Sequence, residues 1–137
     1  MLELPPEYLN KVASQVIMIS SLLSGFSIAI IANLLVYKSD NRITNNILKV
    51  TTIAAGSFLI AVFAMTKLVM LTTEGYPFNY SQDYLTLPKL TGFFAFVMGI
   101  ISLTIVIALS GWTKSKRIGI FTTIVGILTL LMILINL

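Results

Sequence analysis

Long segments without a single charged residue constrain the fold of this chain more than any other feature of its sequence. A helix that crosses the hydrocarbon core of a bilayer needs about 20 consecutive, predominantly apolar residues. The segments that meet or approach this length are 12–37, 50–66, 90–113 and 118–137. We therefore predict four transmembrane helices. Their expected extents are about 12–37, 46–72, 89–112 and 117–136.

The composition is typical of a multi-pass integral membrane protein. Hydrophobic residues make up 57% of the 137 residues and charged residues only 10%, whereas soluble domains carry about 25% charged residues. We expect an all-α fold in which residues 1–137 form one transmembrane bundle of two helical hairpins surrounded by the lipid bilayer. The net charge of +4 comes from basic residues that lie mainly between the apolar segments. There they act as membrane anchors and topology signals, so the charge does not indicate a nucleic-acid partner.

The basic residues also bear on the orientation in the membrane. Those around the first and third connections are Lys38, Arg42, Lys49, Lys114, Lys116 and Arg117. Short cytoplasmic loops carry an excess of Lys and Arg. We therefore expect the first and third connections in the cytoplasm and both termini outside.

The chain lacks the side chains on which most enzymes and metal sites depend. It contains no histidine and no cysteine, which removes the commonest general base and the commonest zinc ligands. The carboxylates all lie outside the predicted spans, and they are Glu3, Glu7, Asp40, Glu74 and Asp83. Paired acids for catalysis or for cation coordination are thus missing from the spans of a single chain. We expect neither an enzyme nor a bound metal or cofactor.

Lys67 lies about one turn inside the end of the second predicted helix. One interpretation is that its long side chain reaches to the membrane interface and keeps its charge in water. The other is that the charge faces a water-filled path. The sequence is compatible with both.

The first predicted helix carries a stripe of residues that is polar at both ends and apolar between them. At about 100° per residue, the members of this stripe fall within an arc of about 80°. They are Gln15, Met18, Leu22, Phe26, Ala29 and Asn33. Between its two polar ends the helix rises about 27 Å, close to the roughly 30 Å thickness of the hydrocarbon core.

Small residues accompany the stripe on two sides of the same helix. Ser20, Ser24 and Ser27 fall opposite to it, while Ser14, Ser21, Gly25 and Ala32 lie beside it. Small residues let helices approach closely in membranes, so we expect neighbours on both sides and the stripe toward the axis of a homo-oligomer. Such a ring would form a pore with a polar mouth and a hydrophobic gate. The alternative is an ordinary apolar stripe packed in the core of the monomer.

Part of this helix resembles a known family. Residues 21–26 (SLLSGF), followed by Ala29, are similar to the first helix of the Orai store-operated calcium channels. Further matches are residues 97–99 and 109–114 in the third helix, and a weaker one at 122–124 in the fourth. The resemblance implies a ring of subunits around a pore lined by the first helix. It also implies cytoplasmic termini, contrary to the loop charges.

The resemblance assigns roles to individual positions and also departs from the family. It places Asn33 at the selectivity filter and Gly25 at a gating hinge, and we expect Ser21, Ser24, Gly25 and Gly99 to act as hinge or helix-packing residues. The family has a glutamate at the position of Asn33, an arginine at that of Met18 and a glutamate at that of Val106. A calcium filter needs anionic oxygens in place of the hydration shell of the ion. We therefore expect weak selectivity, without a preference for calcium.

These observations favour an oligomeric ion channel or pore whose hydrophobic gate is formed by Leu22 and Phe26. One alternative is a non-conducting membrane subunit that scaffolds or anchors a partner, either a membrane protein or a soluble one. The small residues around Ser24 and Gly25 would then bind a helix of the partner. A further alternative is an effector that depolarises membranes, which would share the physics of the pore.

Overall fold

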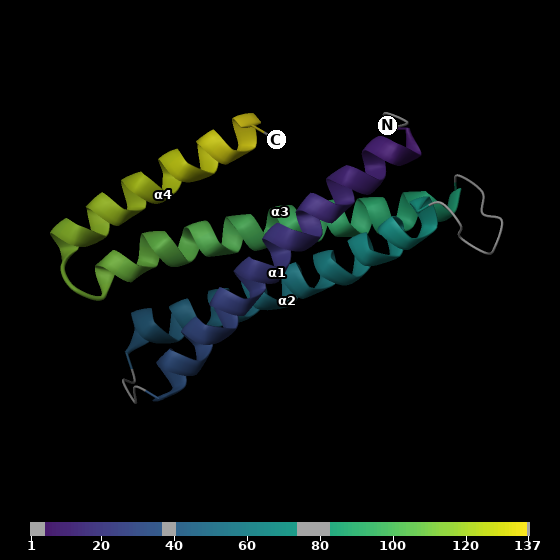
Figure 1. Cartoon of the computed structure of the whole chain (residues 1–137). Helices are drawn as coiled ribbons and strands as arrows, with labels where there is room; N and C mark the ends of the chain where they lie inside the picture. Colours follow the sequence, from purple (N-terminus) through teal and green to yellow (C-terminus); the bar gives the residue numbers. More distant parts are fainter. Residues whose placement is uncertain (1–4, 37–40, 74–82, 137) are drawn as a thin grey trace.

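The computed structural model describes residues 5–36, 41–73 and 83–136 of the chain. The described helices are α1 (Pro6–Val36), α2 (Arg42–Thr72), α3 (Asp83–Trp112) and α4 (Lys116–Asn136) (Figure 1). All four are long and apolar enough to cross a membrane. The prediction of an all-α protein with four transmembrane helices is therefore confirmed.

All four helices begin before the charge-free segments that identify them, and α1, α2 and α3 do so by more than a turn. α1 starts at Pro6, and proline suits the first helical position because its backbone needs no N–H there. α2 starts at Arg42, where the side chain of Asn41 accepts a hydrogen bond of 3.1 Å from the N–H of Ile43. Such a cap satisfies a backbone group at the helix end that has no intrahelical partner. α1 and α2 are therefore longer than the expected extents that start near residues 12 and 46.

α3 also begins earlier than expected, because Pro88 lies inside the helix and not at its start. A proline within a helix removes one backbone hydrogen bond, here to the carbonyl of residue 84, and its ring crowds that carbonyl. This position is close to the helix N-terminus, and the turn that precedes it is helical from Asp83. α3 therefore extends beyond the segment of about 89–112 expected from hydropathy.

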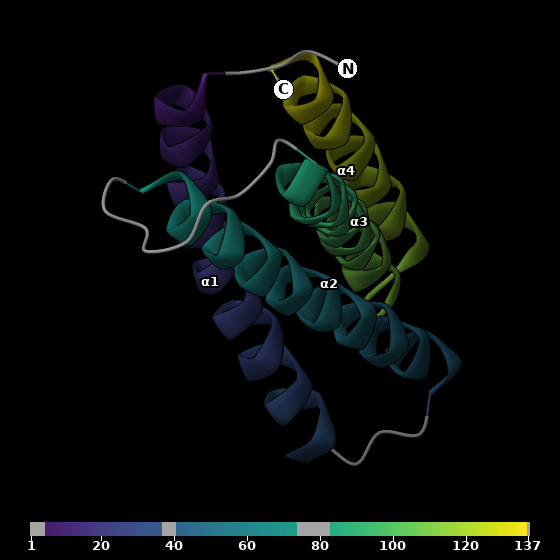
Figure 2. The ribbon, with the colours of Figure 1, turned by 90° about the vertical axis from the view of Figure 1, so that its right-hand side faces the viewer.

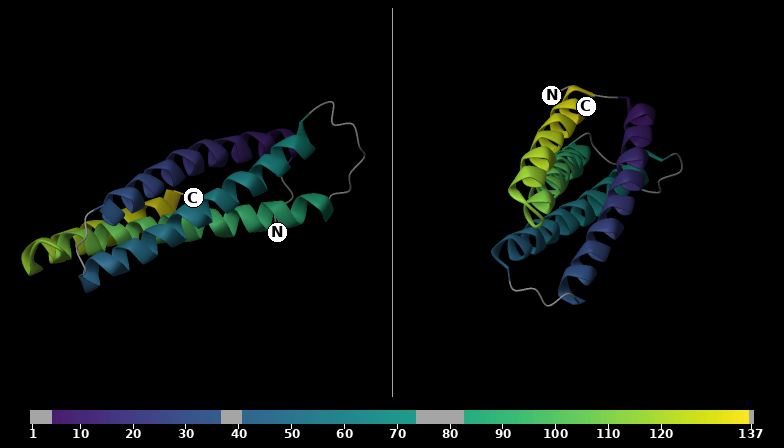
Figure 3. Two further views of the ribbon diagram at one scale, coloured as in Figure 1. Left: turned by 90° about the horizontal axis from the view of Figure 1, so that it is seen from below. Right: turned by 90° about the vertical axis from the view of Figure 1, so that its left-hand side faces the viewer.

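The helices pack in the order in which they follow one another along the chain. α2 and α3 occupy the middle, α1 packs on α2, and α4 packs on α3 (Figures 1 and 2). The other views show α1 and α4 as the two outer members (Figure 3). α1 makes only slight contact with α3, and within the described ranges α4 packs on α3 alone. The arrangement is thus open, and it leaves much of α1 and α4 uncovered by the rest of the chain.

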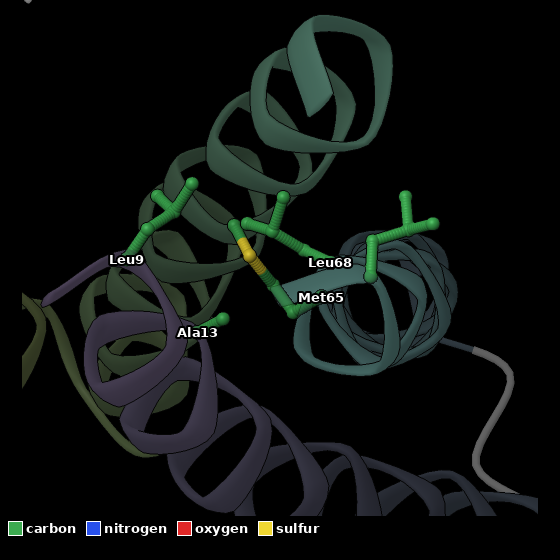
Figure 4. Close-up of a cluster of buried hydrophobic side chains, with 5 residues drawn as sticks. Leu9, Ala13, Met65 and Leu68 are labelled. Carbon is green, nitrogen blue, oxygen red and sulfur yellow. The ribbon is translucent and has the colours of Figure 1, made fainter. Parts of the chain in front are cut away.

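The hydrophobic core consists of two clusters along the central helices. One cluster joins the start of α1 to the end of α2, and its members are Leu9, Ala13, Met65, Leu68 and Leu71 (Figure 4). The other joins α2 to α3, and its members are Ala54, Phe58, Ala61, Phe96 and Ile100. The rings of Phe58 and Phe96 meet edge to face, with centroids 6.2 Å apart. The two clusters hold α1, α2 and α3 together.

The α3–α4 hairpin depends on polar contacts and on glycines near its turn. Trp112 Nε1 donates a hydrogen bond of 2.9 Å to Thr123 Oγ1, and Thr122 Oγ1 donates one of 2.9 Å to the carbonyl of Ala108. A Cβ atom at Gly119 would stand 2.7 Å from Cε2 of the Trp112 indole. Gly119 therefore provides the space in which the indole lies against α4.

Candidate functional site

The stripe predicted from the sequence lies on α1 and is called the α1 stripe from here on: Gln15, Met18, Leu22, Phe26, Ala29 and Asn33. The serines opposite the α1 stripe form the face by which α1 packs on α2. Ser20, Ser24 and Ser27 are all buried. Ser24 Oγ donates to the carbonyl of Ala55 on α2 at 3.4 Å, whereas Ser27 Oγ donates to the carbonyl of Leu23 in its own helix at 2.8 Å. Ser20 Oγ has no hydrogen-bond partner among the described residues. This face of α1 therefore packs closely through small side chains and makes little use of their hydroxyl groups between helices.

The α1 stripe lies on the surface of the chain. Leu22 and Phe26 are 60% and 62% exposed, and Met18 is 52% exposed. Gln15, Ala29 and Asn33 are exposed as well. The helices of a single chain thus leave the whole stripe uncovered, and it does not contribute to the monomer core. No part of the described chain covers the stripe, so it is open to lipid, to another protein or to the water of a pore.

The small residues beside the stripe are also uncovered. Ser14, Ser21, Gly25 and Ala32 are exposed, and no heavy atom outside the local helix backbone lies within 4 Å of the position that a Cβ atom would take at Gly25. α1 continues through Gly25 as an α-helix. A second helix could therefore approach α1 closely along this side without displacing any part of the chain.

Gly99 and Val106 of α3 are placed differently from the stripe. Gly99 is buried against the ring of Phe58, so it serves the packing of α2 on α3. Val106 is buried at 8% exposure and lines a groove between α1, α2 and α3. The structure therefore does not bring these two positions together with the α1 stripe.

Charged groups form no cluster in the described part of the chain that could bind a metal. Within residues 5–36, 41–73 and 83–136, no group of three or more His, Cys, Asp or Glu side chains lies together.

Lys67 is exposed on α2. An exposed position suits a side chain whose charge reaches to the interface.

A polar contact that the sequence analysis did not identify joins the start of α1 to the end of α2. Asn10 Nδ2 lies 3.1 Å from the carbonyl oxygen of Val69. It also lies 3.0 Å from Thr72 Oγ1 and 3.1 Å from Thr73 Oγ1. The sequence offers one signal for this contact: the amide of Asn10 and the hydroxyls of Thr72 and Thr73 lie at a similar depth in the membrane if the first two helices are antiparallel. Such a signal identifies a contact only when the pairing of the helices is known.

Comparisons with known proteins identify no relative of this chain. No protein-family model, no curated protein and no solved structure matches it. The resemblance to the Orai family therefore stays a prediction. A function for the chain therefore has to be argued from the exposed stripe of α1 and from the face that packs on α2.

Proposed function

We propose that the protein is a homo-oligomeric ion channel or pore whose lumen is lined by the α1 stripe. The observation that carries this proposal is the exposure of Leu22 and Phe26, at 60% and 62%, on a helix whose opposite face is buried against α2. The stripe ends in the amides of Gln15 and Asn33. Amides at both ends of an apolar surface are expected where a water-filled path has two mouths and a narrow dry section.

The residues of the stripe would act in sequence along such a lumen. Rings of Phe26 and Leu22 would form a constriction that closes by excluding water, as hydrophobic gates do. A ring of Asn33 would offer neutral amide oxygens and nitrogens at one mouth. Neutral amides replace the hydration shell of a divalent cation poorly compared with carboxylates. The proposed pore is therefore weakly selective and does not favour calcium.

The small flank of α1 supports an assembly of this kind. Ser21 and Gly25 are exposed beside the stripe, and small residues are enriched where transmembrane helices approach one another. In the proposed ring, this flank would contact the α1 helix of the neighbouring subunit. α2 and α3 would then form a layer outside α1, because α1 packs on α2 and α2 packs on α3.

The direct test is conductance of the purified full-length protein in planar lipid bilayers. A hydroxyl group in a dry constriction favours its wetting, so Phe26→Ser should raise the conductance or the open fraction. Phe63→Ser is a matched control, because Phe63 is 73% exposed on α2 and is not in the stripe. No current from either the native chain or Phe26→Ser would overturn the proposal and favour a non-conducting subunit.

A further inference from the structure

A groove opens between three helices at the end of the molecule where α1 ends and α2 begins. Its volume is about 530 Å³, within the roughly 300–1,000 Å³ of typical small-molecule sites. The apolar side chains that line it are Ile30, Leu34, Ile47, Val106 and Ile107. Because the groove lies within helices that can span a membrane, the acyl chains of the surrounding bilayer can reach it.

Along α3 the lining of the groove changes from apolar to polar toward the end of the helix, while Leu34 near the end of α1 is apolar. Val106 and Ile107 lie more than a turn before the end of α3 at Trp112, whereas Ser110 and Thr113 lie at that end. The polar Thr44 likewise lies in the first turn of α2. The groove therefore offers an apolar floor at depth and hydroxyl oxygens near the interface, which matches an amphiphile that lies along the membrane normal.

Basic residues lie close in sequence to the polar lining residues of this groove, with Arg42 two positions before Thr44 and Lys114 directly after Thr113. The end of α1, the start of α2 and the turn between α3 and α4 lie at the same end of the molecule (Figures 1 and 3). The exposed basic residues there are Arg42, Lys49, Lys114, Lys116 and Arg117. Of the carboxylates in the described residues, Glu7 lies at the start of α1 and Asp83 at the start of α3, near the other end. Among the described residues, the end that carries the groove therefore has basic side chains and no carboxylate.

We propose that this groove binds one anionic phospholipid of the bilayer. Its acyl chain lies against Ile47, Val106 and Ile107, and its phosphate lies at the basic end of the groove. Basic pockets between transmembrane helices bind anionic headgroups, and a zwitterionic lipid of the same acyl composition lacks the net charge that these residues attract. The site is separate from the α1 stripe, so it does not depend on the proposed pore.

The test is native mass spectrometry of the full-length protein in detergent with one added lipid. The probes are palmitoyl-oleoyl phosphatidylglycerol and palmitoyl-oleoyl phosphatidylcholine, which share their acyl chains. We expect one phosphatidylglycerol per chain and at least severalfold weaker binding of phosphatidylcholine. Equal retention of the two lipids would overturn the proposal.

Variants locate the bound lipid on the structure. The double variant Lys114→Gln/Arg117→Gln should weaken phosphatidylglycerol binding by about fivefold per lost charge. Its control, Lys11→Gln/Lys89→Gln, removes the same charge near the other end and should leave binding unchanged. An equal loss in both would show diffuse attraction and overturn the site.

A second variant tests the groove itself. Ser110 is an exposed residue at the polar end of the groove, and Ser110→Trp should occlude it and abolish retention of phosphatidylglycerol. Far-ultraviolet circular dichroism checks that the variant is folded, and Ile107→Phe replaces it if it is not. Unchanged retention in a folded, occluded variant would place the lipid elsewhere and overturn the proposal.

Discussion

Gly99 of α3 lies against the aromatic ring of Phe58 of α2. A Cβ atom at position 99 would stand 2.7 Å from Phe58 Cε1, which is closer than real carbon contacts allow. The Phe58 side chain is fully buried and also packs edge to face on Phe96. It therefore has little space to move into, and the absence of a side chain at Gly99 sets how closely α2 and α3 approach.

A larger residue at this position should destabilise the α2–α3 pair. Gly99→Leu is expected to lower the free energy of unfolding by about 1–3 kcal/mol, the usual cost of overpacking a core. Unfolding in mixed detergent–SDS micelles, followed by circular dichroism, measures this change. Gly56→Leu is the control, since no atom lies within 4 Å of the Cβ position there. Equal losses in the two variants would contradict the proposed role of Gly99.

The hydrogen bond from Trp112 to Thr123 should stabilise the α3–α4 hairpin by a measurable but small amount. Interhelical hydrogen bonds in membrane proteins contribute about 0.6 kcal/mol on average in double-mutant cycles. A cycle of Trp112→Phe and Thr123→Val should give a coupling free energy of about this size. Thr123 also donates to the carbonyl of Gly119, so the cycle, and not the single Thr123→Val variant, isolates the bond. A coupling near zero would show that the bond contributes nothing.

The Asn10 contact should respond differently to the loss of its side-chain donor and to the replacement of that donor by an acceptor. Asn10→Ala removes a donor from the three oxygens that face it and should cost about 1 kcal/mol of unfolding free energy. Asn10→Asp instead places a charged acceptor against those oxygens and should cost more. The same micelle unfolding experiment ranks the two variants. Ser14→Ala is a nearby control, because Ser14 Oγ donates only to the carbonyl of Asn10 in its own helix. If Asn10→Asp were as stable as the native chain, the donor role of Asn10 would be wrong.

Cross-linking should separate a ring of α1 helices from other assemblies. The native chain contains no cysteine, so Phe26→Cys introduces a single thiol without further changes. If the α1 stripes face a common axis, a short bis-maleimide should link subunits of Phe26→Cys in membranes. Phe63→Cys, on the exposed side of α2, should react with a mono-maleimide but form few dimers. Dimers from Phe63→Cys alone would place α2 at the subunit contact.

The number of helices can be predicted from the sequence because a charged side chain in the hydrocarbon core of a bilayer costs a large free energy. Runs without charge are enough to count the spans, and no tertiary information is needed. The helix starts depend on finer chemistry. Asn41 caps α2 within a polar stretch, and Pro88 is accommodated near the start of α3. A hydropathy profile contains no information on the Asn41 cap or on the helical turn before Pro88.

The interhelical contacts are harder to predict, for a related reason. Both faces of a membrane helix are apolar, so hydrophobic patterning says little about which face packs. Small size is an incomplete guide as well, because Ser24 is buried against α2 whereas the equally small Ser21 and Gly25 are exposed. Close packing of the face with Ser20, Ser24 and Ser27 could be expected from the sequence, whereas the exposure of the α1 stripe on the monomer and the open order of the helices could not. That order depends on pairings such as Gly99 with Phe58.

The chain-order packing of the helices bears on how the protein enters the membrane during synthesis. Apart from slight contact between α1 and α3, each described helix packs on its neighbours along the chain. The contact surface of every helix pair is therefore complete as soon as the second member has been translated and inserted. Chains with such local contacts fold rapidly, and N-terminal parts fold first as they emerge from the ribosome. The order of synthesis is thus also the order of assembly, and no helix has to wait in the lipid for a distant partner.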